Sequence, residues 1–190
     1  MFNNLDRRVR KTRQALVLGL AALMLEKDVT EISVKDLTDY VDINRSTFYA
    51  HFKDIPALLN YIEDELFNDF NKIITDGLTN TDDVKDAIYP TVLIVFEHLQ
   101  KNKELASALI GPHGDLAFIH KLYHLMRTRI TQWWPSENSE EAQEMNSFYS
   151  AFVFTGVVGI IKEWIRTDYK KTPTEMAKLS TELLIHGINK

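Results

Sequence analysis

Apolar residues recur at helical spacing along nearly the whole chain, and no other feature limits the fold as strongly. Within residues 6–26, for instance, apolar side chains fall at positions that share one face of a helix: Val9, Leu16, Leu20, Leu23 and Met24. We find no pair of alternating apolar and polar runs joined by a hairpin turn. The spacing therefore predicts an all-α protein of about nine helices.

Residues that start and stop helices set the expected boundaries. Pro56 suits the first turn of a helix, Gly77 suits the end of the same helix, and Pro90 is expected to interrupt or kink the next one. The acidic stretch SENSEEAQE, residues 136–144, is expected to be a linker. The predicted helices span about residues 6–26, 33–41, 45–52, 54–75, 84–101, 103–110, 115–133, a segment that ends near 166, and 172–187.

Residues 33–51 contain two short helical segments joined by a tight turn. Ser33 precedes the first segment as an N-cap, and Asp36 stands where a capping box prefers Glu or Gln. In the turn, Asp42 can adopt a left-handed backbone at modest cost, and Asn44 can cap the second segment. This arrangement is typical of a helix-turn-helix, whose second helix enters the DNA major groove.

The side chains around this turn divide between a small core and a polar surface. The apolar residues expected to fix the angle between the two helices are Ile32, Val34, Leu37, Val41, Ile43 and Phe48. By residue type, Arg45 could read guanine and Thr47 could contact the methyl group of thymine. The rest of the expected DNA-binding set suits phosphate contacts or the start of the helix: Ser33, Asn44, Ser46, Tyr49, His51 and Lys53. From spacing alone, the alternative is an ordinary helical hairpin whose polar face meets water.

Charge is distributed unevenly along the chain. The net charge is −5, but residues 1–53 contain nine Lys or Arg against seven Asp or Glu, which leaves thirteen against twenty for the remainder. The slightly basic first part has a group of cations at the start of its first helix: Arg7, Arg8, Arg10, Lys11 and Arg13. These cations could also be a solvated helix end. Because binding to phosphates depends on the local patch, the acidic average does not exclude a nucleic acid partner.

The stretch TRQALVLGLAALMLEKDVTEISVKDLTDYVDINRSTFYAHFKD resembles the N-terminal DNA-binding domain of TetR-family transcriptional regulators. The family's "TFYxHF" signature stands here as Thr47-Phe48-Tyr49-Ala50-His51-Phe52, and the resemblance covers roughly the first 60 residues. GVVGIIKEWI, residues 156–165, is similar to the penultimate helix of many members. The resemblance implies a three-helix DNA-binding domain in residues 1–53 and a helical ligand-binding and dimerisation domain in residues 54–190.

Three positions depart from the family's usual pattern. Asp42 replaces the usual Gly of the turn, and Asn44 replaces the usual Ser before the second helix; both residues suit a turn and a cap. Ile55, followed by Pro56, replaces the Lys that usually opens the fourth helix and meets a phosphate. This substitution puts one DNA backbone contact per subunit in doubt, although the neighbouring Lys53 could partly substitute.

The resemblance also implies a homodimer that binds a near-palindromic operator, with its two half-sites about 34 Å apart. The last two helices of each subunit are expected to form a four-helix interface, in which two glycines allow close approach. The residues assigned to this interface are Phe148, Phe152, Gly156, Gly159, Met176, Leu179 and Leu183. An internal core face is the alternative for the same residues.

Aromatic and polar residues of the middle helices suit a pocket for a small organic effector, as the family implies. The candidate lining residues are Phe96, His120, Tyr123, His124, Arg127 and Phe152. His120 and His124 lie four positions apart on one helix face, a spacing that raises the question of zinc. Because the chain has no HExxH motif and no cysteine, we predict no metal and no cofactor.

These observations predict a sequence-specific transcriptional regulator, in this family most often a repressor, whose binding to double-stranded DNA responds to a small molecule. No Gly-rich phosphate loop or nucleophile motif indicates an enzyme. The apolar run of residues 147–161 is shorter than the roughly 18 residues that indicate a membrane span, so we expect a cytoplasmic protein with no membrane partner. The alternative is a family-like interaction protein with weak or lost DNA binding that acts through a protein partner.

Overall fold

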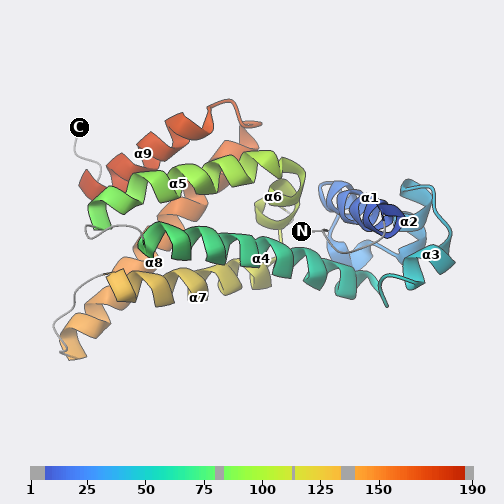
Figure 1. The fold of residues 1–190 in the computed structure, drawn as a ribbon, viewed down its shortest axis with the longest axis horizontal. Helices are drawn as coiled ribbons and strands as arrows, with labels where there is room; N and C mark the ends of the chain where they lie inside the picture. Colours follow the sequence, from blue (N-terminus) through green and yellow to red (C-terminus); the bar gives the residue numbers. More distant parts are fainter. Residues whose placement is uncertain (1–6, 80–83, 113, 134–139, 187–190) are drawn as a thin grey trace. The chain divides into compact units, whose positions relative to one another are not determined.

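The computed structural model describes residues 7–79, 84–112, 114–133 and 140–186 (Figure 1). Within these ranges the chain forms nine α-helices and one short 3-10 helix, Val29–Glu31, with no strand, which confirms the predicted all-α fold. The helices are α1 (Arg7–Met24), α2 (Val34–Tyr40), α3 (Arg45–Tyr49), α4 (Ile55–Thr79), α5 (Val84–Lys101), α6 (Lys103–Ile110), α7 (Leu116–Trp133), α8 (Glu140–Arg166) and α9 (Pro173–His186).

The chain divides into two compact units, and the division falls inside α4. The first unit comprises the residues up to Leu66 together with Lys103–Asp115, and the second comprises Phe67–Asn102 and the residues from Leu116 onward. Helix α6 therefore belongs to the first unit, where it packs against α1. These two units are defined by contacts within the chain. The predicted boundary between residues 53 and 54 separates a DNA-binding domain from a regulatory domain, and it stays a prediction.

The first unit is built around the apolar face of α1. Most of the face predicted from spacing is buried: Leu16, Leu20, Leu23 and Met24. Val9, near the start of the helix, is only half-buried. Gly19 lies where α2 crosses α1, since a Cβ there would overlap the side chain of Val41 and lie 3.0 Å from that of Leu37. The absence of a side chain at Gly19 therefore allows the two helices to approach closely.

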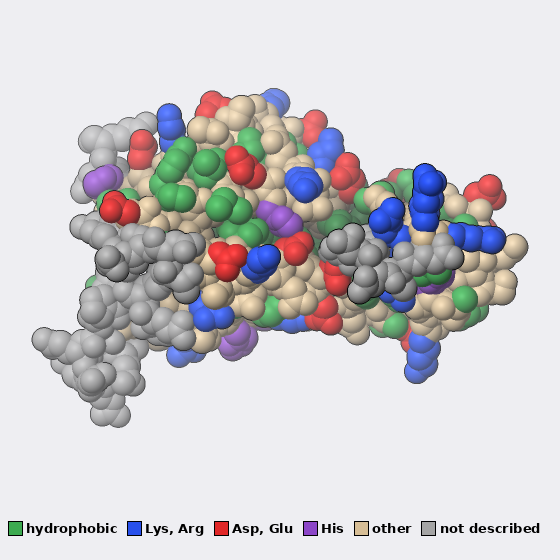
Figure 2. All heavy atoms as spheres, viewed as in Figure 1, with side chains coloured by type: hydrophobic (Ala, Val, Ile, Leu, Met, Phe, Trp, Pro, Cys, Tyr) green, Lys and Arg blue, Asp and Glu red, His purple; other side chains and the backbone are tan. Residues whose placement is uncertain are grey.

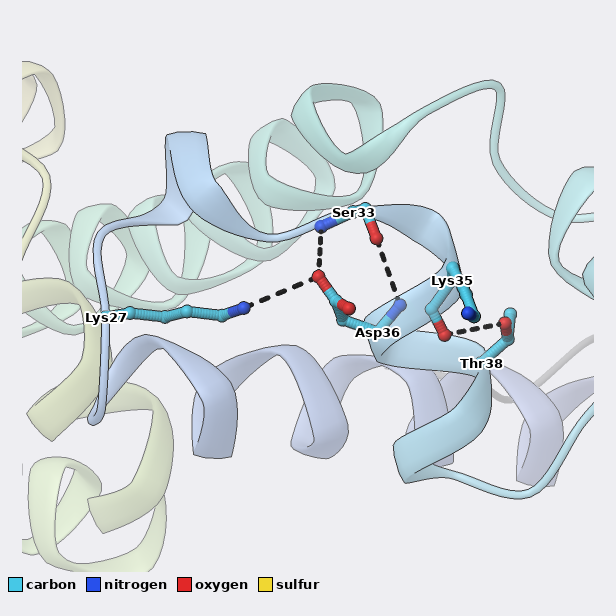
Figure 3. A network of polar contacts seen from close by, with 5 residues as sticks. All are labelled: Lys27, Ser33, Lys35, Asp36 and Thr38. Carbon is cyan, nitrogen blue, oxygen red and sulfur yellow. Dashed lines mark hydrogen bonds and ion pairs between the residues drawn. The ribbon is translucent and has the colours of Figure 1, made fainter.

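Two reciprocal hydrogen bonds begin α2 (Figure 3). Ser33 Oγ accepts a hydrogen bond from the Asp36 N–H at 3.1 Å, and Asp36 Oδ2 accepts one from the Ser33 N–H at 3.0 Å. Lys27 Nζ lies 3.4 Å from the same carboxylate oxygen. The hydrogen bond from the Ser33 backbone is the main reason that the pKa of Asp36 is lowered. Asp36 therefore completes a capping box in place of the usual Glu or Gln.

Replacing Ser33 by alanine is expected to destabilise the first unit by about 1 kcal/mol, because the Asp36 N–H at the start of α2 loses its acceptor. Ser33→Asp is the matched control, since its carboxylate can still cap the helix. Denaturant unfolding in the absence of DNA, followed by circular dichroism, measures both variants. Equal stability of Ser33→Ala and the wild type would show that this hydrogen bond contributes nothing.

Two later helices extend beyond their predicted limits. Helix α4 continues past Gly77 to Thr79. Gly77 does not end the helix. It allows α4 and α5 to pack closely, since a Cβ there would overlap the hydroxyl group of Thr91 on α5. Helix α8 begins at Glu140, so the end of the predicted linker is helical, while residues 136–139 lie outside the described part of the chain.

Trp164 stands in the core of the second unit. Its side chain is 2% exposed and lies edge-on to Phe96 and to Tyr169, with ring centroids 5.2 and 4.7 Å away. The Nε1–H donates a hydrogen bond to the Lys171 carbonyl at 2.8 Å, which satisfies the indole group inside the core. Asp168 and Tyr169 have φ angles of 52° and 53°, so the chain turns sharply after α8 before α9 packs along α5. The predicted end of the last helix, residue 187, lies outside the described part.

Candidate nucleic-acid interface

A tight turn joins α2 to α3. Asp42 has a φ of 53°, as predicted for the residue that replaces glycine there. The Ile43 N–H donates a hydrogen bond to the Thr38 carbonyl at 3.0 Å, which ties the turn to α2. Asn44 occupies the predicted N-cap position of α3, but its side chain makes no capping hydrogen bond. Its carbonyl begins the helix by accepting a hydrogen bond from the Thr47 N–H at 2.9 Å, so the capping role predicted for the Asn44 side chain is wrong.

Helix α3 is shorter than the sequence indicates. It spans Arg45–Tyr49, whereas the spacing favours a helix to Phe52. The N–H groups of His51 and Phe52 both bond the Phe48 carbonyl, at 2.8 and 2.9 Å, and close a turn directly after the helix. His51 therefore lies on this turn and not on the helix.

The side chains of α3 and of the following turn divide between interior and surface as predicted, except that Thr47 and His51, expected to face outward, are partly covered. Phe48 is fully buried and Phe52 is 8% exposed, whereas Tyr49 is 58% exposed. Thr47 and His51 are half-buried. Of the other residues predicted for this core, Ile32 and Leu37 are buried, whereas Val34, Val41 and Ile43 are half-buried. The exposed members of the predicted DNA-binding set are Ser33, Asn44, Arg45, Ser46, Tyr49 and Lys53.

This surface combines hydrogen-bond donors with positive charge. Figure 2 shows Lys and Arg side chains gathered on the part of the molecule formed by α1–α3. The guanidinium of Arg45 and the hydroxyl groups of Ser46 and Tyr49 can donate hydrogen bonds to phosphate oxygens or base edges. The pKa of His51 is lowered, first by burial and second by the charge of Arg13, so the imidazole is neutral at pH 7. A neutral imidazole still donates one hydrogen bond.

The residues predicted to line an effector pocket differ widely in exposure. Phe96 is fully buried in the core, while Phe152 is 74% exposed. Tyr123 is half-buried against Phe154, with ring centroids 5.3 Å apart. The polar residues predicted for the pocket lie on the solvent-facing side of α7: His120, His124 and Arg127. Among the described residues, no group of three or more His, Cys, Asp or Glu could hold a metal ion.

A cavity of about 400 Å³ lies between α4 and α5. Its lining combines apolar residues with three charged side chains and a hydroxyl group: Lys72, Ile73, Asp76, Gly77, Asp86, Ala87, Pro90, Thr91 and Ile94. None of these residues belongs to the predicted pocket. Gly77 and Pro90 are the sequence signals that could have indicated the cavity, since glycine removes side-chain volume and a proline inside a helix leaves a carbonyl without its helical partner.

One face of α8 is apolar and exposed. Phe148 is 62% exposed, and Met145 and Tyr149, which were not predicted for the interface, are 45% and 47% exposed. Gly156 and Gly159 are exposed further along the helix, and a Cβ added at either would meet nothing within 4 Å. Packing inside the chain therefore does not require these glycines.

The α9 residues predicted for the same interface have mixed positions. Leu179 is 41% exposed and Leu183 is half-buried, but Met176 is 4% exposed. Met176 is a core residue of its own chain, because α9 packs along α5. Within the described residues, one stretch, Glu144–Arg166 of α8, is long and apolar enough to cross a membrane by length and composition alone. It is longer than the apolar run of residues 147–161, and 22% of its apolar 18-residue window is buried.

The helical fold and the exposed surface of α3 define a helix-turn-helix protein of the DNA-binding class. Residues 86–186 match the family model TetR_C_8, which describes a transcriptional regulator C-terminal region. This match covers more than half of the chain, and the chain belongs to the TetR family of transcriptional regulators. The family and the structural neighbours are DNA-binding regulators and not enzymes.

Three proteins illustrate the similarity. In sequence, the chain is 21% identical to nucleoid occlusion factor SlmA of Sodalis glossinidius (strain morsitans), over 93% of this chain and 94% of that protein. A TetR-family transcriptional regulator from Bordetella parapertussis 12822 aligns with a TM-score of 0.73 and 16% identity, over 93% of this chain and 95% of that one. Transcriptional regulator FadR from Bacillus subtilis, in complex with stearoyl-CoA, aligns with a TM-score of 0.68 and 14% identity, over 93% and 99% of the two chains. At these identities the solved structures show a shared fold alone.

Proposed function

We propose that the protein is a homodimeric, sequence-specific DNA-binding regulator, a cytoplasmic repressor whose binding responds to a small-molecule effector. The observation that supports this proposal best is the surface of α3, where Arg45, Ser46 and Tyr49 are exposed and Phe48 is fully buried. The buried ring anchors the short helix to its unit, and the exposed side presents the polar groups that a recognition helix needs.

Each residue of this surface has a proposed role that follows from its chemistry. Arg45 reads guanine with two hydrogen bonds, and Thr47 contacts the methyl group of thymine. Tyr49, His51 and Lys53 bind phosphates, which sets the register of the protein on the duplex without reading its sequence.

The residues at the start of α4 also support a phosphate contact for Lys53. Ile55, which stands where the family usually has a phosphate-binding Lys, is 5% exposed and belongs to the core. Lys53 is exposed two positions earlier, so we propose that it takes over this phosphate contact. The hydroxyl groups of Ser33 and Ser46 and the amide of Asn44 are exposed as well and complete the contact set.

Selection of binding sites from random duplex DNA tests this assignment. We expect a near-palindromic site to be enriched, because a symmetric dimer presents two copies of α3. Tyr49→Ala should weaken binding to that site about 10- to 100-fold, since a hydrogen bond to a charged phosphate and the packing of the ring are both lost. Tyr49→Phe is the matched control that removes the hydroxyl group alone. Titrations at two salt concentrations should show tight, salt-sensitive binding by the wild type.

The alternative function is that of an interaction protein which has lost strong DNA binding. The inward position of Ile55 is the observation that favours it, because one family phosphate contact is missing at that position. In that case the selection would enrich no sequence, and binding would be weak and abolished by salt. The same experiment therefore decides between the two functions.

The exposed face of α8 supports the homodimer. Contiguous exposed apolar residues of this kind mark interaction surfaces. Phe148 and Phe152 lie four positions apart and so share one side of the helix, and Gly156 and Gly159 would let a second helix approach closely. We propose that two copies of α8 pair across a two-fold axis, with Leu179 of α9 at the same interface.

The cavity between α4 and α5 supports control by an effector. Its volume of about 400 Å³ falls in the range of small-molecule sites. FadR from Bacillus subtilis binds stearoyl-CoA, and we propose that this chain also takes an amphipathic ligand. Ile73, Ala87 and Ile94 would contact its apolar part, while Lys72 and Asp86 would select its polar groups. Such a ligand controls DNA binding only if its affinity differs between two conformations of the dimer.

Ile94→Trp is expected to fill this cavity and abolish the response to ligand. A ligand that binds the folded state raises the unfolding temperature, so a panel of amphipathic small molecules can be screened by thermal unfolding. We expect the active compounds to stabilise the wild type and the control Leu116→Trp, whose site is 70% exposed and outside the cavity, but not Ile94→Trp. Equal stabilisation of the three proteins would place the effector elsewhere.

A further inference from the structure

The guanidinium of Arg13 on α1 lies over two neighbouring aromatic rings of the first unit. Its Cζ is 5.7 Å from the ring centroid of Phe52, which follows α3, and 5.7 Å from that of Tyr61 on α4. The centroids of these two rings are 5.4 Å apart, and the rings are tilted by 53°. The negative face of an aromatic ring attracts a guanidinium at such distances. Arg13 thus joins α1 to the end of α3 and to the beginning of α4.

Arg13 differs from the other cations at the start of α1. Arg7, Arg10 and Lys11 are exposed, whereas Arg13 is half-buried and its Nε is shielded from solvent without a hydrogen-bond partner. Burial of an unpaired polar atom is unfavourable, so the two rings have to offset that cost. The attraction between a guanidinium and a ring strengthens as both leave water. Packing therefore holds Arg13 against the two rings, while the exposed cations near it on α1 remain available to solvent or DNA.

A series of ring contacts leads from Arg13 to the exposed side of α3. The rings of Phe52 and Phe48 lie 6.2 Å apart, and Phe48 meets Tyr49 edge-on at 5.5 Å. Helix α3 has only five residues, and an isolated helix of that length is unstable. Its orientation therefore depends on the side chains that anchor it. Phe52 anchors the C-terminal end, where Arg13 and Tyr61 hold it.

We propose that Arg13 is a positioning residue for DNA recognition: it holds the end of α3 through Phe52 and Tyr61 and does not itself contact DNA. The inference rests on the recognition surface proposed for α3. The competing role is a direct phosphate contact, which the type of residue would also suit. The two roles differ in salt dependence. Loss of one phosphate contact reduces the slope of log K against log salt concentration by about 0.9, whereas loss of a positioning contact leaves the slope unchanged.

The charge of Arg13 also provides a readout in the absence of DNA. His51 precedes Phe52 on the turn after α3, and the Arg13 charge adds to burial in lowering the pKa of His51. Removing that charge should raise the His51 pKa, while burial still holds it below its ordinary value. A change in this titration reports the position of the guanidinium at the end of α3, which a general loss of stability would not produce.

The test uses the full chain and the operator found by site selection. Arg13→Met removes the charge and keeps an apolar side chain, and Arg10→Met, which removes an exposed charge one helical turn earlier, is the matched control. We expect Arg13→Met to weaken operator binding by about 10-fold or more with an unchanged salt slope. NMR titration should show a raised His51 pKa in Arg13→Met and an unchanged one in Arg10→Met.

Circular dichroism first establishes whether Arg13→Met folds. If it does not, a second variant tests the same inference. Tyr61→Leu removes one of the two rings and keeps the charge. We expect the same direction of change, namely weaker operator binding with an unchanged salt slope. Unchanged operator affinity in the folded variant, or a salt slope reduced by about 0.9 in Arg13→Met, would overturn the inference.

Tyr49→Ala separates a failure of this inference from a failure of the proposed function. Binding that is lost in Tyr49→Ala but kept in Arg13→Met contradicts the positioning role alone. Binding that is unchanged in Tyr49→Ala contradicts the recognition surface of α3, and the positioning role with it.

Discussion

Phe152→Glu is expected to convert the dimer into a monomer and to weaken binding to the selected operator by about 100-fold or more, because two half-sites are no longer bound together. Phe152 is 74% exposed, so the substitution leaves the core of the subunit intact. In a two-fold interface each substitution appears twice, which brings two carboxylates into one apolar contact. Light scattering after size-exclusion chromatography measures the mass, and a binding titration measures the affinity.

Leu116→Glu is the matched control for this experiment. Leu116 is 70% exposed on α7, outside the α8 face, so this variant should remain a dimer with unchanged operator affinity. A dimeric Phe152→Glu protein would show that another surface forms the interface. Because α8 is also apolar enough to cross a membrane by length and composition, flotation with lipid vesicles tests whether this face binds lipid and not a second subunit. Vesicle binding that Phe152→Glu abolishes, without any change in mass, would assign the face to lipid.

Phe48→Ala is expected to have the largest effect on stability, a loss of about 3–5 kcal/mol in the free energy of unfolding. The Phe48 ring is fully buried and contacts both Tyr49 and Phe52. Its removal therefore leaves a cavity between α3 and the rest of the unit. Denaturant unfolding followed by circular dichroism measures the loss. Operator binding should be lost in parallel, since α3 has no other fully buried side chain.

Tyr40→Ala is the control for Phe48→Ala, because it removes an aromatic ring of the same unit that is 58% exposed. We expect this variant to lose less than about 1 kcal/mol. Comparable losses in the two variants would contradict the anchoring role of Phe48, and so would full operator affinity in a folded Phe48→Ala protein.

Local signals predicted most helix limits well. Helices α5 and α6 have the bounds that the sequence indicates, residues 84–101 and 103–110, although α5 runs through Pro90 without the interruption that the proline had suggested. The left-handed backbone of Asp42 and the start of α2 after Ser33 also follow from local sequence. In each case the deciding hydrogen bonds join residues only a few positions apart, so the information lies within a short stretch of chain.

Positions that depend on a neighbouring helix were predicted less well. Gly77 has the character of a helix end, yet the close approach of Thr91 explains why a glycine stands there. By residue type, Phe96 suited the effector pocket and Met176 suited the dimer interface. Both side chains are buried in the core of the second unit. Periodicity identifies the apolar face of a helix but not the element that covers it.

Spacing and short motifs were sufficient for the all-α fold, the helix-turn-helix and the family, because these rest on interactions between residues near one another in the chain. Packing between helices settled the rest. It places Arg13 over the rings of Phe52 and Tyr61, forms the cavity between α4 and α5, and leaves apolar side chains of α8 exposed among the described residues. These features depend on how each helix is rotated against its neighbours, and side chains distant in sequence set that rotation.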